Sequence, residues 1–262
     1  MNNVTVTPYP TYESNKPAAA VLASLVGISL IAWIVQSIQA RFNPRRPMVL
    51  ILLSHLTIFT ELILRAVLPT ETRNSRNAFT AASVMLAVGQ RTIILANYDF
   101  LTQVDEPRTC RSRGIIIGSI LAAAGSTVLT APAGTLSYNV DTIDQSFRFR
   151  QAAAAIVLCT TVLFYPIWYA TKTIKRMTKQ AIILLTISSL TSLLVAVYLQ
   201  VISILKYYVD ANKQEFWYYI FQLTPIVIAL FTWTIIHPKR SLVHIPKAKD
   251  ETKQDINMTS RI

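Results

Sequence analysis

Charged residues, cysteines and histidines are all scarce in this chain. Only 15% of its 262 residues are charged, whereas a soluble domain has about 25%, and 52% are hydrophobic. The two cysteines, Cys110 and Cys159, are too few for a disulfide framework. The three histidines, His55, His237 and His244, are too far apart in the chain to suggest a metal site. These shortages point away from an ordinary soluble domain and from a small disulfide-linked one.

Sequence signatures of common enzymes are also missing. The chain has no His-Glu-x-x-His zinc helix, no Gly-x-Ser-x-Gly nucleophile elbow and no phosphate-binding loop. Tyr98-Asp99 resembles half of an intramembrane aspartyl protease pair, but no Gly-x-Gly-Asp segment supplies the other half. We therefore interpret Asp99 as a polar residue at the cytoplasmic end of a helix, and we expect no enzyme activity, no cofactor and no metal.

Long apolar stretches dominate what the chain does contain. A helix needs roughly 20 apolar residues to cross the hydrocarbon core of a bilayer, and seven stretches are long enough. They are Ala18–Ala40, Pro47–Leu68, Asn77–Leu101, Gly114–Gly134, Gln151–Ala170, Gln180–Leu205 and Phe216–His237. The sequence thus predicts an all-α, polytopic membrane protein with seven transmembrane helices.

The positive charge of the chain, formally +12, has two common explanations: a nucleic-acid surface or cytoplasmic loops of a membrane protein. Of the 25 Lys and Arg residues, 16 lie in loops one, three and five and in the C-terminal tail, and seven lie on the opposite side. This asymmetry predicts that the N-terminus is outside and the C-terminus is cytoplasmic, and it argues against a nucleic-acid partner.

The two tails flank the predicted seven-helix domain, which spans residues 18–238. Residues 1–17 form the predicted extracellular tail, where Asn3 begins an Asn-x-Thr sequon and is a candidate glycosylation site. Residues 239–262 mix Lys with Asp, Glu, Ser and Thr and form the predicted cytoplasmic tail.

Small residues recur every four positions in the fourth span, at Gly114, Gly118, Ala122 and Ser126. Such a ridge lets two helix backbones approach closely in lipid. It predicts either homo-oligomerisation through Gly114 and Gly118 or packing within the chain, and the second interpretation is favoured.

Ionisable and amide side chains inside the spans are the best candidates for function, because polar groups are expensive at membrane depth. Glu61 and Arg65 share one face of the second span, and their i, i+4 spacing predicts an ion pair. The structural alternative is that Arg65 extends to the outer surface and Glu61 only pairs with it.

Counting residues from the ends of the predicted spans places the remaining polar side chains at two depths in the membrane. At about 1.5 Å per residue, Glu61, Gln200 and Gln222 lie roughly 10 Å below the outer interface, whereas Arg91 lies nearer the inner side, level with Ser54. The sequence therefore predicts an outward-facing polar vestibule and a separate inner polar layer, and leaves open whether the faces converge.

The last span and its flanks resemble a family of fungal seven-span membrane proteins. The run Glu215–Pro225 and the closing His237-Pro238 are similar to the lipid-translocating exporters known as aminocholesterol-resistance, or RTA-like, proteins. The segment Gln90–Tyr98 is similar to the third span of that family, and Glu61 matches its second-span glutamate. The chain departs from the family at Gln222, where the family has an aspartate before the proline.

This resemblance implies a stress-resistance protein of the plasma membrane that moves amphipathic lipids, or regulates their movement, without a cofactor. Sphingoid bases, sterol-like amines and porphyrins are the substrates it implies, and a cationic amine could pair with Glu61 or Glu215. The main alternative is a receptor of the G-protein-coupled type for a hydrophobic ligand, and a third is a scaffold without a ligand. The candidate substrate-binding residues are Glu61, Arg65, Arg91, Gln200, Glu215, Tyr219 and Gln222.

Overall fold

The computed structural model describes residues 15–104, 110–170, 177–211 and 213–238. Within these ranges the chain is helical and contains no strand. The long helices are α1 (Lys16–Gln39), α2 (Arg45–Val67), α4 (Arg76–Val104), α5 (Cys110–Leu136), α6 (Ile143–Ala170), α7 (Lys179–Ile202) and α10 (Thr224–Ile235). Shorter elements are α3 (Thr70–Arg73), the 3-10 turn η1 (Val140–Thr142), α8 (Leu205–Ala211), α9 (Glu215–Tyr218) and the π-helical turn η3 (Tyr219–Leu223).

Seven helical segments among the described residues are long and apolar enough to cross a membrane. Six are α1, α2, α4, α5, α6 and α7, and α9, η3 and α10 together form the seventh, Glu215–Ile235. The predicted all-α fold with seven spans is therefore confirmed, and the protein is a multi-pass membrane protein.

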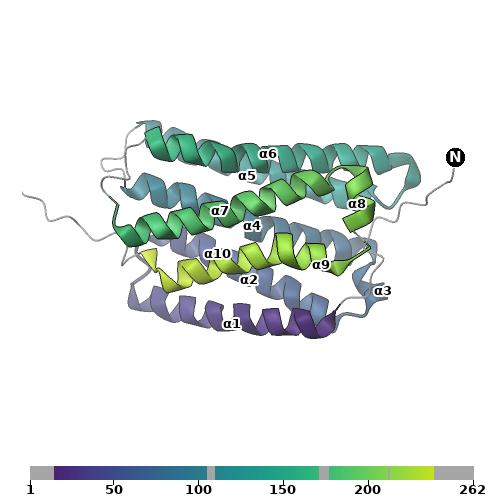
Figure 1. The fold of residues 1–262 in the computed structure, drawn as a ribbon, viewed down its shortest axis with the longest axis horizontal. Coiled ribbons are helices and arrows are strands. Elements are labelled where there is room, and N and C mark those ends of the chain that lie inside the picture. The colour runs from purple at the N-terminus through teal and green to yellow at the C-terminus, as the bar shows by residue number, and fades with distance from the viewer. Residues whose placement is uncertain (1–14, 105–109, 171–176, 212, 239–262) are drawn as a thin grey trace, which may run out of the picture.

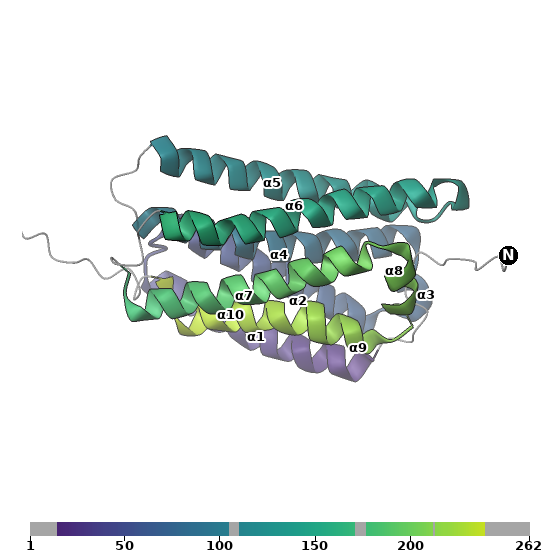
Figure 2. The ribbon, with the colours of Figure 1, turned by 45° about the horizontal axis from the view of Figure 1, so that its top comes forward.

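The helices run side by side as one elongated bundle (Figure 1). α4 packs against α2 on one side and α5 on the other, and it also contacts α7 and α10. α5 and α6 pair with each other and form one edge of the bundle (Figure 2). The short elements α3, α8 and α9 lie together at the end of the bundle where α1 begins, and α10 ends at the opposite end.

The odd number of spans places the start of the first span and the end of the last at opposite ends of the bundle. The end that carries α3, α8 and α9 corresponds to the predicted outer side, and we call it the outer end. Its cellular orientation stays a prediction. Asn3 and the predicted cytoplasmic tail lie outside the described residues.

Several helix boundaries differ from those predicted by hydropathy. α4 continues to Val104, so Asp99 lies near the inner end of the helix, as predicted, but within its last turns, where it is buried. α6 begins at Ile143, eight positions before the predicted start, because its first turns pack on neighbours: Phe147 is buried and Ser146 donates a hydrogen bond to the Ala133 carbonyl. Hydropathy detects the lipid-crossing part of a helix and misses such polar extensions.

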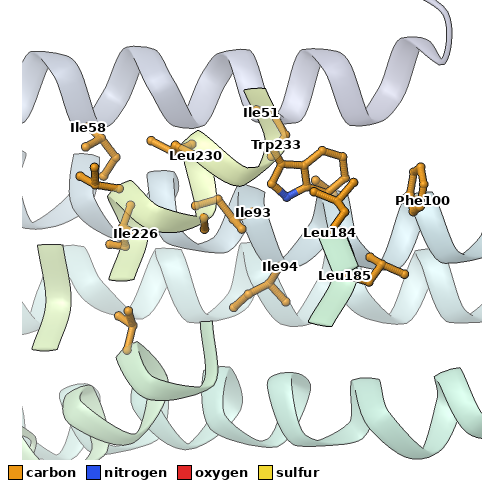
Figure 3. Close-up of a cluster of buried hydrophobic side chains, with 14 of the residues drawn as sticks. Ile51, Ile58, Ile93, Ile94, Phe100, Leu184, Leu185, Ile226, Leu230 and Trp233 are labelled. Carbon is orange, nitrogen blue, oxygen red and sulfur yellow. The ribbon is translucent and has the colours of Figure 1, made fainter. Parts of the chain in front are cut away.

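The core lies where α2, α4, α7 and α10 meet (Figure 3). Trp233 of α10 packs edge-on against Phe100 of α4, with ring centroids 5.8 Å apart. Its indole Nε1 donates to Ser188 Oγ at 3.0 Å, and Ser188 donates to Asn97 Oδ1 at 2.8 Å. This chain of hydrogen bonds joins three helices, which is how polar groups hold helices together where lipid removes the hydrophobic drive for association.

Close helix approach occurs at glycines other than those singled out in the sequence. A Cβ on Gly89 of α4 would lie 2.7 Å from Ile58 Cδ1 of α2. A Cβ on Gly134 would lie 2.9 Å from Thr80 Oγ1. A Cβ on Gly114 or Gly118 would instead meet no atom within 4 Å. The favoured interpretation, packing of these two glycines within the chain, is therefore wrong, since α5 lies at the bundle edge; homo-oligomerisation stays a prediction.

Candidate functional site

A cavity of about 450 Å³ opens between the helices toward the outer end. This volume is within the range of small-molecule sites in proteins. Every long helix except α1 and α10 contributes to the lining, together with α3, α8, α9 and η3. Apolar side chains make up most of it, including Leu64, Leu68, Leu86, Leu199 and Ile202. The polar and charged side chains in the lining are Glu61, Arg65, Arg73, Ser83, Gln90, Arg91, Thr130, Arg150, Tyr198, Ser203, Tyr208, Tyr218 and Gln222.

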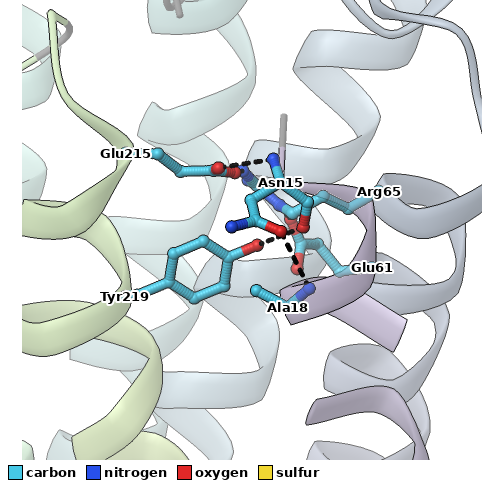
Figure 4. Close-up of polar contacts among 6 residues, drawn as sticks. All are labelled: Asn15, Ala18, Glu61, Arg65, Glu215 and Tyr219. Carbon is cyan, nitrogen blue, oxygen red and sulfur yellow. Dashed lines mark hydrogen bonds and ion pairs between the residues drawn. The ribbon is translucent and has the colours of Figure 1, made fainter. Parts of the chain in front are cut away.

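Glu61, Arg65 and Glu215 form a buried charge cluster beside this cavity (Figure 4). Arg65 Nε and Nη2 donate to Glu61 Oε1 at 3.1 and 2.9 Å, and Nη1 donates to Glu215 Oε1 at 3.2 Å. The side chains of Glu61, Arg65 and Glu215 are only 3%, 11% and 9% exposed. The predicted Glu61–Arg65 pair is thus confirmed, but Arg65 lies between two carboxylates instead of extending to the surface.

Further contacts tie the start of α1 to the same cluster. The Arg65 guanidinium lies 4.1 Å from the centre of the Tyr218 ring, a cation–π contact. The Asn15 backbone N–H donates to Glu215 Oε2 at 2.6 Å, and Tyr219 Oη donates to the Asn15 carbonyl at 3.5 Å (Figure 4). Asn15 also caps α1, because its side chain accepts from Ala18 N. Asn15 and Glu215, which are 200 positions apart in the chain, are therefore joined at the outer end of the bundle.

The seventh span changes its helical geometry at the level of the cavity. Thr224 N–H bonds to the carbonyl of Tyr219, five residues earlier, which closes the π-helical turn η3. Pro225 follows and has no N–H to donate, so a regular α-helical hydrogen bond to Phe221 cannot form. The wider turn carries Gln222, which is buried and lines the cavity. Such π turns inside helices are frequently found at functional sites.

Arg91 and Gln90 of α4 line the cavity from another side. Arg91 Nε donates to Ser126 Oγ at 2.7 Å, and Nη2 donates to the Ser126 carbonyl at 3.1 Å and to Thr130 Oγ1 at 3.2 Å. Arg91 is 5% exposed and Gln90 is 2% exposed. The predicted separation of Arg91 into an inner layer is wrong, because Arg91 lines the same cavity as Glu61. Side chains on a helix point back toward its N-terminus, and α4 begins at the outer end.

The seven candidate residues from the sequence fall into three groups. Four of them line the cavity: Glu61, Arg65, Arg91 and Gln222. Glu215 belongs to the adjoining charge cluster, and Tyr219 donates to the carbonyl of Asn15, which itself contacts Glu215. Gln200 is half-buried on α7 and is not among the residues that line the cavity, although its neighbours Tyr198 and Leu199 are.

Arg73, Arg150 and Gln90 also line the cavity and were not among the candidates. In the sequence Arg73 and Arg150 stand in segments between apolar runs. Arginine in such a segment ordinarily indicates only on which side of the membrane the segment lies. Arg73 is instead buried, and the Arg150 guanidinium lies over the rings of Tyr208 and Phe147 at 4.7 and 5.5 Å. Aromatic residues near such an arginine were the one available signal that it turns inward.

The opposite end of the bundle holds a second, separate group of polar residues. Asp99 accepts a hydrogen bond from Gln103 Nε2 at 2.6 Å, and its carboxylate lies 3.8 Å from Arg46 Nη1. His55 and His237 both pack against the Trp33 ring, at centroid distances of 6.0 and 5.2 Å. Two of the dispersed histidines thus pack on the same indole ring. Within the described ranges, no three His, Cys, Asp or Glu side chains are grouped so as to hold a metal.

Comparisons of the chain with protein-family models, with curated proteins and with solved structures found no match.

Proposed function

We propose that this membrane protein binds an amphipathic, lipid-like molecule in the outer cavity and moves it, or regulates its movement, between the two leaflets. The observation that carries this proposal is the composition of the cavity wall. Apolar side chains such as Leu64, Leu68 and Ile202 share one cavity with buried polar side chains such as Gln90 and Gln222. A molecule with both a polar head and an apolar chain matches such a wall.

The seventh span supplies a means of movement. A π turn followed by Pro225 weakens the regular hydrogen-bond ladder of a helix, and non-ideal backbone at membrane depth is tolerated where it lines a cavity. Gln222 sits on this turn and belongs to the cavity lining. Straightening or shifting the turn would change the shape of the cavity, which favours transfer of a ligand over permanent storage.

The resemblance to the RTA-like exporters supports the same function, and we carry that family forward as part of the proposal together with its plasma-membrane location. The family resemblance implies cationic amines as substrates. The carboxylates of Glu61 and Glu215 would have to bind such an amine, yet both already accept hydrogen bonds from Arg65. The chemistry of the headgroup is therefore a separate question from the function itself.

A transfer assay in liposomes tests this function. The purified chain is reconstituted into phosphatidylcholine liposomes that carry a fluorescent-tailed amphiphile in one leaflet, and its appearance in the other leaflet is measured by collisional quenching. We expect faster transfer than in protein-free liposomes. Transfer at the protein-free rate would contradict a translocator, whereas binding without transfer would favour the receptor alternative.

Matched variants connect the assay to the cavity. Ala82 lines the cavity and Ala124 is exposed on α5 away from it. Ala82→Phe should fill the cavity and lower the transfer rate, and Ala124→Phe should leave the rate unchanged. Equal effects of the two substitutions would show that the cavity is not the route.

A further inference from the structure

Arg91 is a buried cation without a buried anion. The residue is 5% exposed, and all its hydrogen bonds go to neutral acceptors of Ser126 and Thr130. No carboxylate of the described chain forms an ion pair with it, and its Nη1 has no hydrogen-bond partner. Burying a charge is unfavourable unless the charge is paired. Because no described carboxylate pairs with it, a guanidinium held in this way indicates room for the anionic group of a bound ligand.

Gln90, the neighbour of Arg91, adds a second unused donor. Its side-chain Nε2 is buried and has no hydrogen-bond partner, and both residues line the same cavity. Donor groups of Arg91 and Gln90 are therefore available on adjacent positions of α4. A carboxylate or a phosphate, which only accepts hydrogen bonds when ionised, is the complement of such a pair.

The charges of the whole cavity lining are mostly of one sign. Among the described side chains, four arginines, Arg65, Arg73, Arg91 and Arg150, line it, against one acidic residue, Glu61. Glu61 Oε1 is already bound twice by Arg65, so its charge is compensated within the chain. Glu61 Oε2 remains without a partner, so among the described lining residues one carboxylate oxygen is left to accept from a cationic ligand.

We propose that the cavity binds an amphipathic anion whose carboxylate or phosphate group pairs with Arg91 and Gln90 and whose hydrocarbon chain lies along the apolar lining. This inference rests on the proposed function, because it names the ligand class of the same cavity. It replaces the cationic amine as the favoured headgroup. Arginine suits the role because its planar guanidinium bonds carboxylates and phosphates through two parallel contacts.

A binding experiment with ligands of one chain length and different heads tests the proposal. The full chain is reconstituted in phosphatidylcholine nanodiscs and titrated with oleate, oleyl phosphate, oleyl alcohol, oleylamine and inorganic phosphate. We expect oleate and oleyl phosphate to bind about tenfold or more tightly than the alcohol and the amine, because the Arg91 guanidinium attracts an anion, bonds a neutral hydroxyl more weakly and repels an ammonium group. Inorganic phosphate alone should bind more weakly than oleyl phosphate, because it lacks the chain.

Substitutions assign the preference to the residues named. Arg91→Gln should abolish the preference for anions, whereas Arg148→Gln, at an exposed position of α6, should retain it. Ser126→Ala removes the hydrogen bond that holds Arg91 Nε but keeps the charge, so it should lower the melting temperature and retain the preference. If Arg91→Gln does not fold, Gln90→Leu, which removes the second donor, should weaken anion binding severalfold.

The possible results separate this inference from the function on which it rests. Tighter binding of oleylamine than of oleate, or an unchanged anion preference in Arg91→Gln, would overturn the anion site while leaving an amphiphile-binding cavity. Equal binding of inorganic phosphate and oleyl phosphate would overturn the amphipathic part. If none of the four oleyl ligands binds, or if Ala82→Phe binds all of them as well as the natural chain does, the proposed function fails as well.

Discussion

Replacement of Arg65 by glutamine is the most informative perturbation of the charge cluster. Arg65 contacts the carboxylates of both Glu61 and Glu215, and all three side chains are almost fully buried. Arg65→Gln leaves two carboxylates near each other in a poorly solvated site without the cation that balanced them. The folded state should then be destabilised both by the loss of hydrogen bonds and by the uncompensated charge of the two buried carboxylates.

The magnitude follows from the geometry. At about 3 Å and an effective dielectric constant of about 20, each ion pair has a Coulomb energy of roughly 5 to 6 kcal/mol. Desolvation of the charges opposes most of this energy, and removal of one partner from a buried pair typically costs about 3–5 kcal/mol. We therefore expect Arg65→Gln to lower the free energy of unfolding by about 3–5 kcal/mol.

Glu61→Gln is the matched comparison. Arg65 still has Glu215 as its counter-ion in this variant, and the glutamine oxygen can still accept from Arg65, so the expected loss is smaller, about 1.5–3 kcal/mol, as for hydrogen bonding to a charged group. The double variant Arg65→Gln/Glu61→Gln should be more stable than Arg65→Gln, because it removes one of the two uncompensated carboxylates. The prediction therefore covers the order of stability of the three variants as well as the size of each loss in the free energy of unfolding.

Unfolding in mixed micelles of a nonionic detergent with increasing dodecyl sulfate, followed by circular dichroism, measures these differences. Reversibility is checked by diluting the dodecyl sulfate. The reasoning would be refuted if Arg65→Gln lost less than about 1 kcal/mol, or if the second substitution destabilised the protein further instead of restoring stability.

Three other perturbations test the packing, the polar core and the topology. Gly89→Val should destabilise by about 1–3 kcal/mol in the same assay because its side chain would overlap Ile58, whereas Gly118→Val should be neutral; equal effects would contradict the observed helix approach. Ser188→Ala should lose about 1–3 kcal/mol by leaving the indole N–H of Trp233 unpaired, and a loss near zero would argue against the three-helix hydrogen-bond chain. Cys110, which is exposed, should react with a membrane-impermeant maleimide only after intact cells are permeabilised, and labelling of intact cells would reverse the predicted orientation.

The positions of the spans could be predicted from the sequence because a bilayer imposes a length. A helix that crosses it must present about 20 apolar residues in a row, and this requirement is local. The Glu61–Arg65 pair was predictable for the same reason, since residues four apart on a helix are always neighbours. Polar helix extensions, such as the first turns of α6 before Gln151, were missed because packing and not hydropathy stabilises them.

The candidate site required the tertiary structure. Glu215 contacts Arg65 across 150 positions, and nothing in either local segment encodes that meeting. The sequence placed Arg91 in an inner layer, but its side chain reaches the outer cavity because side chains point back along a helix and α4 begins at the outer end.

The sequence by itself determined that the chain crosses the membrane seven times, because each crossing depends on the solvation of one short segment. Only the tertiary structure decided which of the few charged side chains meet. The Arg65 cation lies between two carboxylates, whereas Arg91 has neutral partners from α5. Helix rotation and crossing set these partners, and they depend on close contacts such as that between Gly89 and Ile58, which are distributed over the whole bundle.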